Sequence, residues 1–195
     1  MSSDPADADP VVAVILAAGA SSRMGRCKPL LPWAGGTLLS HTIATVRSAG
    51  VVDLVVVWGS DPAVRDEARR CRVTPVQNAN WAAGPGGSIA AGVAGLPDSA
   101  TLILTADTPL VAADDLRSLM RHPPAASAFA GTFGPPACFP ASARSALQSL
   151  PVDRGARSVL AGYGNALRLV PIETAGDDLD TPAAYEAAYR SHHSA

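Results

Sequence analysis

The sequence predicts an α/β protein of three layers, in which helices cover both faces of a mainly parallel central sheet. Uncharged runs rich in β-branched residues alternate with segments in which apolar residues recur at helical spacing. Four such strand-then-helix units follow one another, and this order favours parallel strands joined by crossover helices. The length of 195 residues and the hydrophobic fraction of 48% fit one packed domain.

The four units occupy the first two thirds of the chain. Each expected strand is a short apolar run. Each expected helix either has a glycine or a proline at one of its ends or carries charged residues in its first turn. The helix with apolar residues at 38, 39, 43 and 46 is expected to end at Gly50, and Pro62 suits the first turn of the next helix. The strands are expected at Val11–Ala17, Asp53–Gly59, Arg72–Val76 and Thr101–Ala106, and the three later helices at Asp61–Arg70, Gly84–Leu96 and Ala112–Arg121.

The last third of the chain is less regularly patterned. Short strands are expected at Ala126–Ala130, Ala137–Phe139 and Leu167–Ile172, and helices at Ser142–Leu150, at Arg157–Leu160 and from Ala183 onward. Residues 1–10 are expected to form a disordered leader, residues 11–190 a single domain and residues 191–195 a flexible tail.

Composition excludes several classes of protein. With 15 basic and 17 acidic residues the chain lacks the cationic excess that binds nucleic acid or anionic membranes, so neither is an expected partner. No apolar run reaches the roughly 18 residues of a membrane span. Three cysteines without a C-x-x-C pair indicate a reducing compartment, and the acidic first ten residues are unlike a signal peptide. A cytoplasmic protein is expected.

The segment that follows the first strand is the most informative one. Small residues at 17–20 let the backbone approach a ligand closely, and successive amides there form a site for anions. Arg23 and Lys28 add two cations nearby, which suits a polyphosphate. Because the segment leaves the carboxyl end of a predicted parallel strand, it lies where open α/β sheets bind ligands.

Spacing excludes two other phosphate-binding motifs. The dinucleotide fingerprint G-x-G-x-x-G fails because Ser21 occupies the second glycine position after Gly19. The Walker motif fails because Met24 stands where its second glycine is required. The loop therefore represents a different class of phosphate site.

The string LAAGASSRMGRCKPLLPW resembles the signature LAAG-x-S-x-RMG-x-x-K-x-LLP of MobA-like nucleotidyltransferases, with most similarity to the molybdenum cofactor cytidylyltransferase branch. Further matching segments are NANWAAGPGGS at 78–88, LTADTP at 104–109, DRGAR at 153–157 and DLDTP at 178–182. The resemblance implies a nucleotidyltransferase fold of the Rossmann-like type.

The resemblance also implies which residues bind the nucleotide and carry the reaction. Lys28, Arg23 and Asp107 correspond to the catalytic positions. The nucleotide-binding positions fall on Leu16, Ala17, Ala18, Gly19, Arg23 and Lys28 in the first loop, and on Asn78, Gly84 and Ser88 in the second.

A divalent metal is expected on Asp107, with Asp180 as a second acidic position. Asp107 directly follows an uncharged strand, and one or two carboxylates with phosphate oxygens and water suffice for Mg²⁺, or for Mn²⁺ as the alternative ion. Each aspartate also has a purely structural interpretation. Asp107 is a turn former before Pro109, and Asp180 precedes a helix start capped by Thr181 with Pro182 in its first turn.

The implied activity is transfer of CMP from CTP to a phosphorylated acceptor, with release of pyrophosphate. Ala17-Ala18-Gly19 goes with cytidine in this family, and the implied acceptor is molybdenum-bearing molybdopterin. A molybdenum hydroxylase apoprotein is then an implied partner. The alternatives are a transferase that uses GTP or another acceptor, an NAD(P)H-dependent reductase of the nicotine blue oxidoreductase type, and a non-catalytic nucleotide-binding chaperone.

Four other residues stand near the loops. Cys27 is expected to be a modifiable thiol, since neighbouring cations stabilise a thiolate. His41 is expected to lie on a helix face. Trp33 and Trp81 flank the two loops; core or rim packing is the expected role of both, and lining of a substrate pocket is the alternative.

Overall fold

A computed structural model describes residues 10–177 and 179–193, and its centre is a seven-stranded sheet of order β5-β4-β1-β6-β8-β7-β9. The expected leader lies outside the described residues except for Pro10, as do the last two residues of the expected tail. The strands are β1 (Val11–Ala17), β4 (Leu54–Trp58), β5 (Thr74–Gln77), β6 (Ala100–Thr105), β7 (Ala125–Phe129), β8 (Thr132–Phe139) and β9 (Arg168–Pro171).

The sheet is mainly parallel, as predicted. β5, β4, β1 and β6 run in one direction, with β1 at the centre of this half. β8 is antiparallel to both of its neighbours, and β9 pairs in parallel with β7. Because β1 and β6 end side by side, with Leu16 opposite Thr105, the residues that follow them meet at one edge of the sheet.

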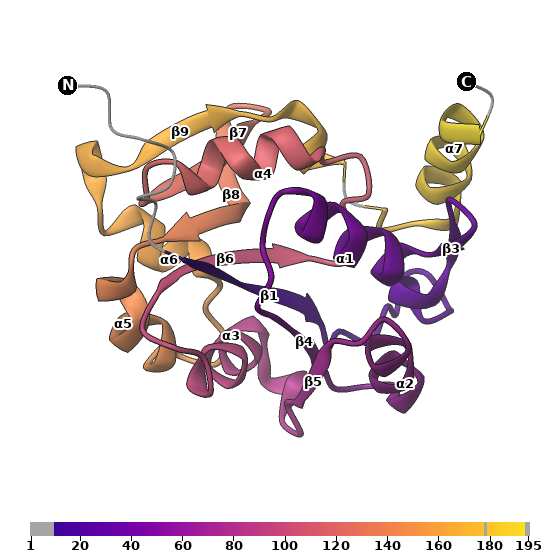
Figure 1. Ribbon diagram of the computed structural model, residues 1–195. Coiled ribbons are helices and arrows are strands. Elements are labelled where there is room, and N and C mark those ends of the chain that lie inside the picture. Colours follow the sequence, from indigo (N-terminus) through magenta and orange to yellow (C-terminus); the bar gives the residue numbers. More distant parts are fainter. Residues whose placement is uncertain (1–9, 178, 194–195) are drawn as a thin grey trace.

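Helices cover both faces of this sheet (Figure 1), which confirms the three-layer prediction. α1 (Leu38–Ser48), α2 (Pro62–Arg70) and α4 (Ala113–Met120) pack on one face, and α3 (Pro85–Ala94), α5 (Arg144–Gln148) and α6 (Ala156–Ala161) on the other. The last helix, α7 (Pro182–His193), lies beyond the sheet beside the short β2–β3 hairpin (Pro32–Trp33 and Gly36–Thr37). It extends into the segment that was expected to be a flexible tail.

Alternate residues of β1 supply the two main cores. Ala13 and Ile15 pack under α1 and α4, whereas Val14 packs against α3 on the opposite face. Both faces of the strand are therefore apolar, which is why its sequence is a continuous apolar run.

β8 is longer than predicted. The expected strand was Ala137–Phe139, but pairing with β7 starts at Thr132. The earlier part of the strand was not predicted because it contains Gly134 and two prolines, which are disfavoured within strands. The register shifts where Pro135 and Pro136 stand, so the prolines occupy an irregularity that needs no ladder hydrogen bond from them.

Contact between α3 and the sheet depends on Gly92. A Cβ atom there would lie 2.5 Å from Val14 Cγ1 and 2.9 Å from Val57 Cγ2, and both valines are fully buried. We expect Gly92→Ala to lower the free energy of unfolding by about 1–3 kcal/mol in urea denaturation, because the helix or the strands must shift. Gly95→Ala is the matched control, since a Cβ at Gly95 meets nothing within 4 Å. Equal stability of the two variants would contradict this account of the packing.

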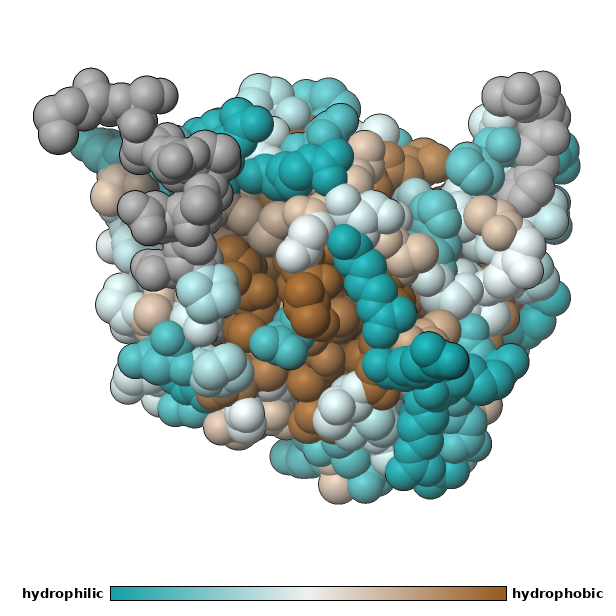
Figure 2. All heavy atoms as spheres, in the orientation of Figure 1, coloured by the Kyte–Doolittle hydropathy of each residue, from teal (hydrophilic) through white to brown (hydrophobic). Residues whose placement is uncertain are grey.

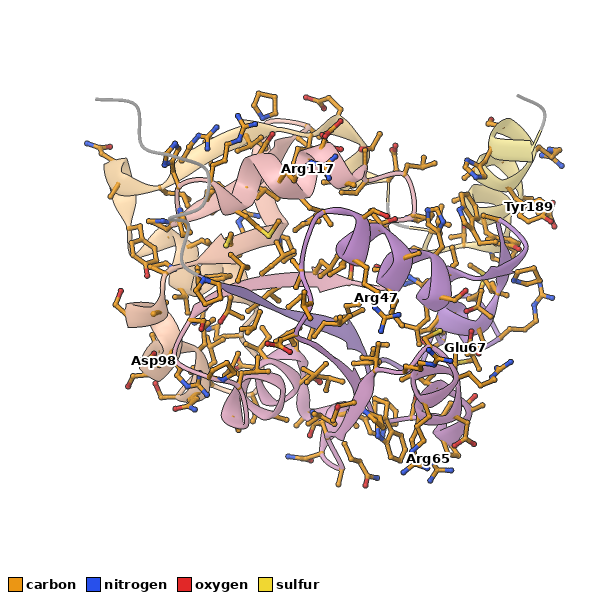
Figure 3. The ribbon with its side chains drawn as sticks, in the orientation of Figure 1. Arg47, Arg65, Glu67, Asp98, Arg117 and Tyr189 are labelled. Atoms are coloured by element: carbon orange, nitrogen blue, oxygen red, sulfur yellow. The ribbon has the colours of Figure 1, made fainter. Side chains whose placement is uncertain are left out.

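A buried carboxylate joins α1 to α2. Glu67 lies between these helices (Figure 3), and its Oε1 accepts a hydrogen bond of 2.7 Å from the Thr37 hydroxyl. Thr37 also caps α1, because its side chain accepts a hydrogen bond from Ser40 N. An ion pair with Arg70 compensates the charge of Glu67.

The molecular surface is mixed. In the view of Figure 2, apolar atoms reach the surface near the middle of the face, between bands of polar groups. Among the described residues, the large hydrophobic side chains with most exposure are those of Val52, Leu169 and Val152. No helix within the described ranges has both the length and the apolar character required to cross a membrane.

Candidate active site

A cavity of about 440 Å³ opens at the carboxyl ends of β1 and β6. It brings together most residues that the sequence singled out. The loop after β1 forms one wall, the segment before and at the start of α3 forms another, and the two predicted metal ligands complete the lining. The sequence-predicted residues that line it are Leu16, Ala17, Ala18, Gly19, Arg23, Lys28, Gly84, Ser88, Asp107 and Asp180.

Ser60, which follows β4, fixes the start of the first loop. Its backbone N–H donates to Ala18 O at 3.3 Å and its hydroxyl donates to Gly19 O at 2.8 Å. Because C=O and N–H point in opposite directions in a trans peptide, the amides of Gly19 and Ala20 point away from Ser60. This arrangement suits the binding of an anion by the loop.

Ser21 organises the next part of the loop. It has a φ of 52°, a left-handed conformation that is uncommon for a residue other than glycine. Its carbonyl accepts hydrogen bonds from Met24 N and Gly25 N, and its hydroxyl accepts one of 3.0 Å from Lys28 N. Ser21 therefore positions Lys28, a role that the sequence analysis missed because a left-handed serine leaves no sequence signal.

Lys28 joins the two predicted metal ligands. Its Nζ lies 2.7 Å from Asp107 Oδ2 and 2.6 Å from Asp180 Oδ1, and the lysine is buried. Burial by itself lowers the pKa of Lys28, but the charges and hydrogen bonds of the two aspartates outweigh it, and the pKa rises above its usual value. Lys28 is therefore a protonated cation at the centre of the site.

Among the described residues, Asp180 has two cationic partners and Asp107 has one. Arg23 Nη1 lies 2.6 Å from Asp180 Oδ2. The hydrogen bond from Lys28 lowers the pKa of Asp180, helped by the charges of Lys28 and Arg23. Asp107 Oδ1, by contrast, is shielded from solvent and accepts no hydrogen bond from the described residues. A buried carboxylate oxygen without a partner has free capacity for another positively charged group.

Of the three residues predicted to bind the nucleotide in the second loop, Gly84 and Ser88 line the cavity and Asn78 does not. Asn78 is buried and is not among the lining residues; its Nδ2 donates to Ser88 Oγ at 2.9 Å and its Oδ1 accepts from Asn80 N. Asn78 thus holds Ser88, which does line the cavity. Gly84 has a φ of 135°, and a Cβ there would lie 2.4 Å from Val152 O, so only glycine fits.

Of the flanking residues, one departs from expectation. Trp33 is buried in a core cluster, and Trp81 packs against another core cluster while also lining the cavity. Cys27 is not activated: burial and the carboxylate of Asp61 raise the pKa of its thiol to about 12. Arg23 and Lys28 face the aspartates of the site instead. His41 lies on α1, with Nε2 3.0 Å from Pro109 O, as expected of a helix-face residue.

Fold and site together define an α/β protein with a cavity, a small-residue loop and a lysine–carboxylate centre at one edge of its sheet. The sequence profile of the MobA-like NTP transferase domain matches residues 13–169. The chain belongs to the MobA-like nucleotidyltransferase family.

Two curated relatives resemble nearly the whole chain. Purine catabolism protein PucB of Bacillus subtilis (strain 168) is 30% identical over 198 residues, covering 93% of this chain and 97% of that protein. Nicotine blue oxidoreductase of Paenarthrobacter nicotinovorans is 30% identical over 190 residues, covering 88% of this chain and 92% of that protein. The chain is thus similar, over most of its length, to proteins named for different activities.

Solved structures share the fold. A nucleotidyl transferase from Methanothermobacter thermautotroptrophicus superposes with a TM-score of 0.81 at 23% identity, covering 95% of this chain and 98% of that one. Rv0371c from Mycobacterium tuberculosis H37Rv, in complex with manganese, superposes with a TM-score of 0.74 at 22% identity, covering 93% and 99%.

Proposed function

We propose that the protein transfers a nucleoside monophosphate from a nucleoside triphosphate to a phosphorylated acceptor and releases pyrophosphate. The observation that carries this proposal is the buried Lys28 ammonium, which joins Asp107 and Asp180 at a cavity walled by the small-residue loop. Transfer of a phosphoryl-type group needs mainly positioning and charge neutralisation, and this arrangement supplies both.

Asp107 and Asp180 are the proposed ligands of a divalent cation, Mg²⁺ or Mn²⁺. Their oxygens face a common point, and Asp107 Oδ1 has no hydrogen-bond partner within the described residues. Two carboxylates completed by phosphate oxygens and water are a usual donor set for Mg²⁺. When bound, such an ion neutralises phosphate charge and orients the reacting oxygens.

The side chains of the first loop are assigned to the triphosphate. Lys28 and Arg23 neutralise charge on the β- and γ-phosphates, and the amides near Gly19 hold their oxygens. An oxygen of the acceptor phosphate attacks the α-phosphorus in line and forms a new P–O bond. The bond to the bridging α–β oxygen breaks, and pyrophosphate leaves with that electron pair while the cations of the loop stabilise its charge.

CTP is the proposed donor and molybdenum-bearing molybdopterin the proposed acceptor. Ala17-Ala18-Gly19, the sequence that favours cytidine, lines the cavity together with Gly84 and Ser88, which are assigned to the nucleoside. Trp81 lines the same wall and offers an aromatic surface for a base. In this proposal residues 11–190 form one catalytic domain of a cytoplasmic enzyme, which delivers its product to a molybdenum hydroxylase apoprotein.

A reductase that uses NAD(P)H is the second candidate. It is supported by the 30% identity with nicotine blue oxidoreductase over 88% of this chain. The two candidates differ in what Lys28, Asp107 and Asp180 do. Transfer uses all three at the phosphates, whereas hydride transfer to a substrate requires no pair of carboxylates at a cation.

A thermal-shift panel with CTP, GTP, ATP and NADPH, each with and without Mg²⁺, separates these candidates. A ligand at about 100 times its dissociation constant adds roughly 2.7 kcal/mol, which raises the melting temperature of such a domain by several degrees. We expect the largest shift with CTP, and only with Mg²⁺. Release of pyrophosphate on addition of molybdenum-bearing molybdopterin then tests the acceptor. A shift with NADPH alone, independent of Mg²⁺, would overturn the transferase proposal in favour of the reductase.

A further inference from the structure

We propose that Tyr185, which is not among the residues lining the cavity, is a positioning residue that holds Asp180 against Lys28. This inference rests on the proposed function for its catalytic meaning, but its structural part stands on contacts alone. Tyr185 lies in the first turns of α7, and Asp180 lies just before that helix.

Asp180 needs such support because it belongs to no helix or strand. The preceding residue, Leu179, is linked to the rest of the site by a hydrogen bond of 3.4 Å from its N–H to Asp107 O, which is longer than a normal N–H···O bond. The side chain of Asp180 is 34% exposed. The ion pairs with Lys28 and Arg23 alone would therefore have to order a short irregular segment.

A small apolar cluster lies behind the ion pairs. It consists of Met24, Leu31, Trp33, Leu38, Leu179 and Tyr185, and we call it the clasp cluster. Its members are close in sequence to the charged residues of the site: Met24 follows Arg23, Leu31 follows the turn that begins at Lys28, and Leu179 precedes Asp180. The clasp cluster therefore packs together the segments that carry the three charged residues.

The hydroxyl of Tyr185 makes the most specific contact of this cluster. It donates a hydrogen bond of 2.6 Å to Pro32 O, across 153 residues of chain. Pro32 comes directly after the Lys28–Leu30 turn and Leu31, while Tyr185 N donates to Thr181 O in the first turn of α7. Thr181 also caps the helix by accepting from Ala184 N, as predicted. The segments that carry Lys28 and Asp180 are therefore joined a second time, through Tyr185.

Aromatic rings hold α7 in this position. The Trp33 ring lies 6.4 Å from that of Tyr185, 6.0 Å from that of Tyr189 and 5.1 Å from that of His192, measured between centroids. Tyr189 lies on the side of α7 near the hairpin that carries Trp33 (Figure 3). Such contacts fix the face of the helix that meets the hairpin, and so the direction of the Tyr185 hydroxyl.

Hydrogen exchange of the full chain tests the structural part of the proposal. Tyr185→Phe removes the hydroxyl and keeps the ring. We expect it to accelerate exchange about three- to tenfold in α7 and also in residues 21–31, as the loss of one hydrogen bond predicts. Tyr163→Phe, the same change beside α6 on the opposite side of the molecule, should leave residues 21–31 unchanged. Acceleration confined to α7, or none, would overturn the proposal.

Affinity for Mn²⁺ and CTP tests the functional part. Tyr185→Phe should weaken binding of the Mn²⁺–CTP pair about three- to tenfold, whereas in an Asp180→Asn background it should have no further effect. Additive losses would show that Tyr185 does not act through Asp180, and would contradict the proposal. If the wild-type chain binds neither CTP nor GTP with Mn²⁺, the proposed function fails, and the exchange experiment alone decides the role of Tyr185.

Discussion

Replacing Lys28 with methionine is expected to lower the rate of nucleotidyl transfer by about 10²–10³-fold, the usual cost of removing one preorganised group that stabilises charge in a transition state. The methionine keeps most of the side-chain volume at this buried position and removes the positive charge. The two aspartates then face each other without the cation that now lies 2.7 and 2.6 Å from them. Steady-state release of pyrophosphate from CTP measures the loss.

For the same variant we expect affinity for a divalent ion to rise although turnover falls. Because the ammonium occupies the point shared by Asp107 and Asp180, it competes with a divalent ion in the absence of nucleotide. We expect Lys28→Met to bind Mn²⁺ alone more tightly than the wild-type chain in calorimetry. Arg121→Met removes a positive charge from an exposed position at the end of α4 that does not line the cavity, and should change neither quantity. Full turnover by Lys28→Met would reject the assignment of Lys28 to the triphosphate.

Asp107→Asn is expected to abolish the part of nucleotide binding that depends on the metal ion, and to reduce turnover by about 10³-fold. The amide keeps the size of the side chain but loses the charge, and it places an N–H₂ group where one oxygen binds Lys28 or where the other is free for a cation. The thermal shift produced by CTP with Mg²⁺ should fall to the value without Mg²⁺.

Asp114→Asn is the matched control for Asp107→Asn. Asp114 is an exposed residue in the first turn of α4, paired with Arg117, and lies outside the cavity lining. It should retain the Mg²⁺-dependent shift. If Asp107→Asn also retains that shift, the carboxylate is not a metal ligand, and its role reduces to its ion pair with Lys28.

The part of the sheet that positions the first loop could be predicted because the signals lie within short stretches of sequence. β1 is apolar on both faces, and the loop after it carries a long specific motif. The strand, the loop and the place of Lys28 in that loop could therefore be predicted from the sequence. β8 was predicted too short because its prolines stand at a register shift, which depends on the partner strand. The β2–β3 hairpin is only two residues long on each side, below the length at which alternation is visible.

Other parts of the site depend on contacts between particular side chains and distant backbone or side-chain groups. Sequence patterns do not reveal such contacts. Ser60 holds the first loop across 41 residues, and Asn78 turned out to hold Ser88 at the cavity wall. Cys27 was expected to be a modifiable thiol because cations are its neighbours in sequence. In space its neighbour is Asp61, which is an anion. For the first loop and for Cys27 the partner comes from another strand–helix unit, whereas Asn78 and Ser88 belong to one unit and are joined by a side-chain contact that the sequence pattern does not show.

The charged residues that line the cavity balance one another. Two carboxylates, Asp107 and Asp180, face two cations, Lys28 and Arg23, so the network is neutral without any ligand. Such a site folds without waiting for an ion, and it offers no net charge that would trap a free cation or a free anion. When a nucleotide binds together with its metal ion, two exchanges balance each other. Lys28 exchanges its carboxylate partners for phosphate, and the carboxylates exchange Lys28 for the metal ion. The resting site is thereby expected to discriminate in favour of the metal–nucleotide complex over either component alone.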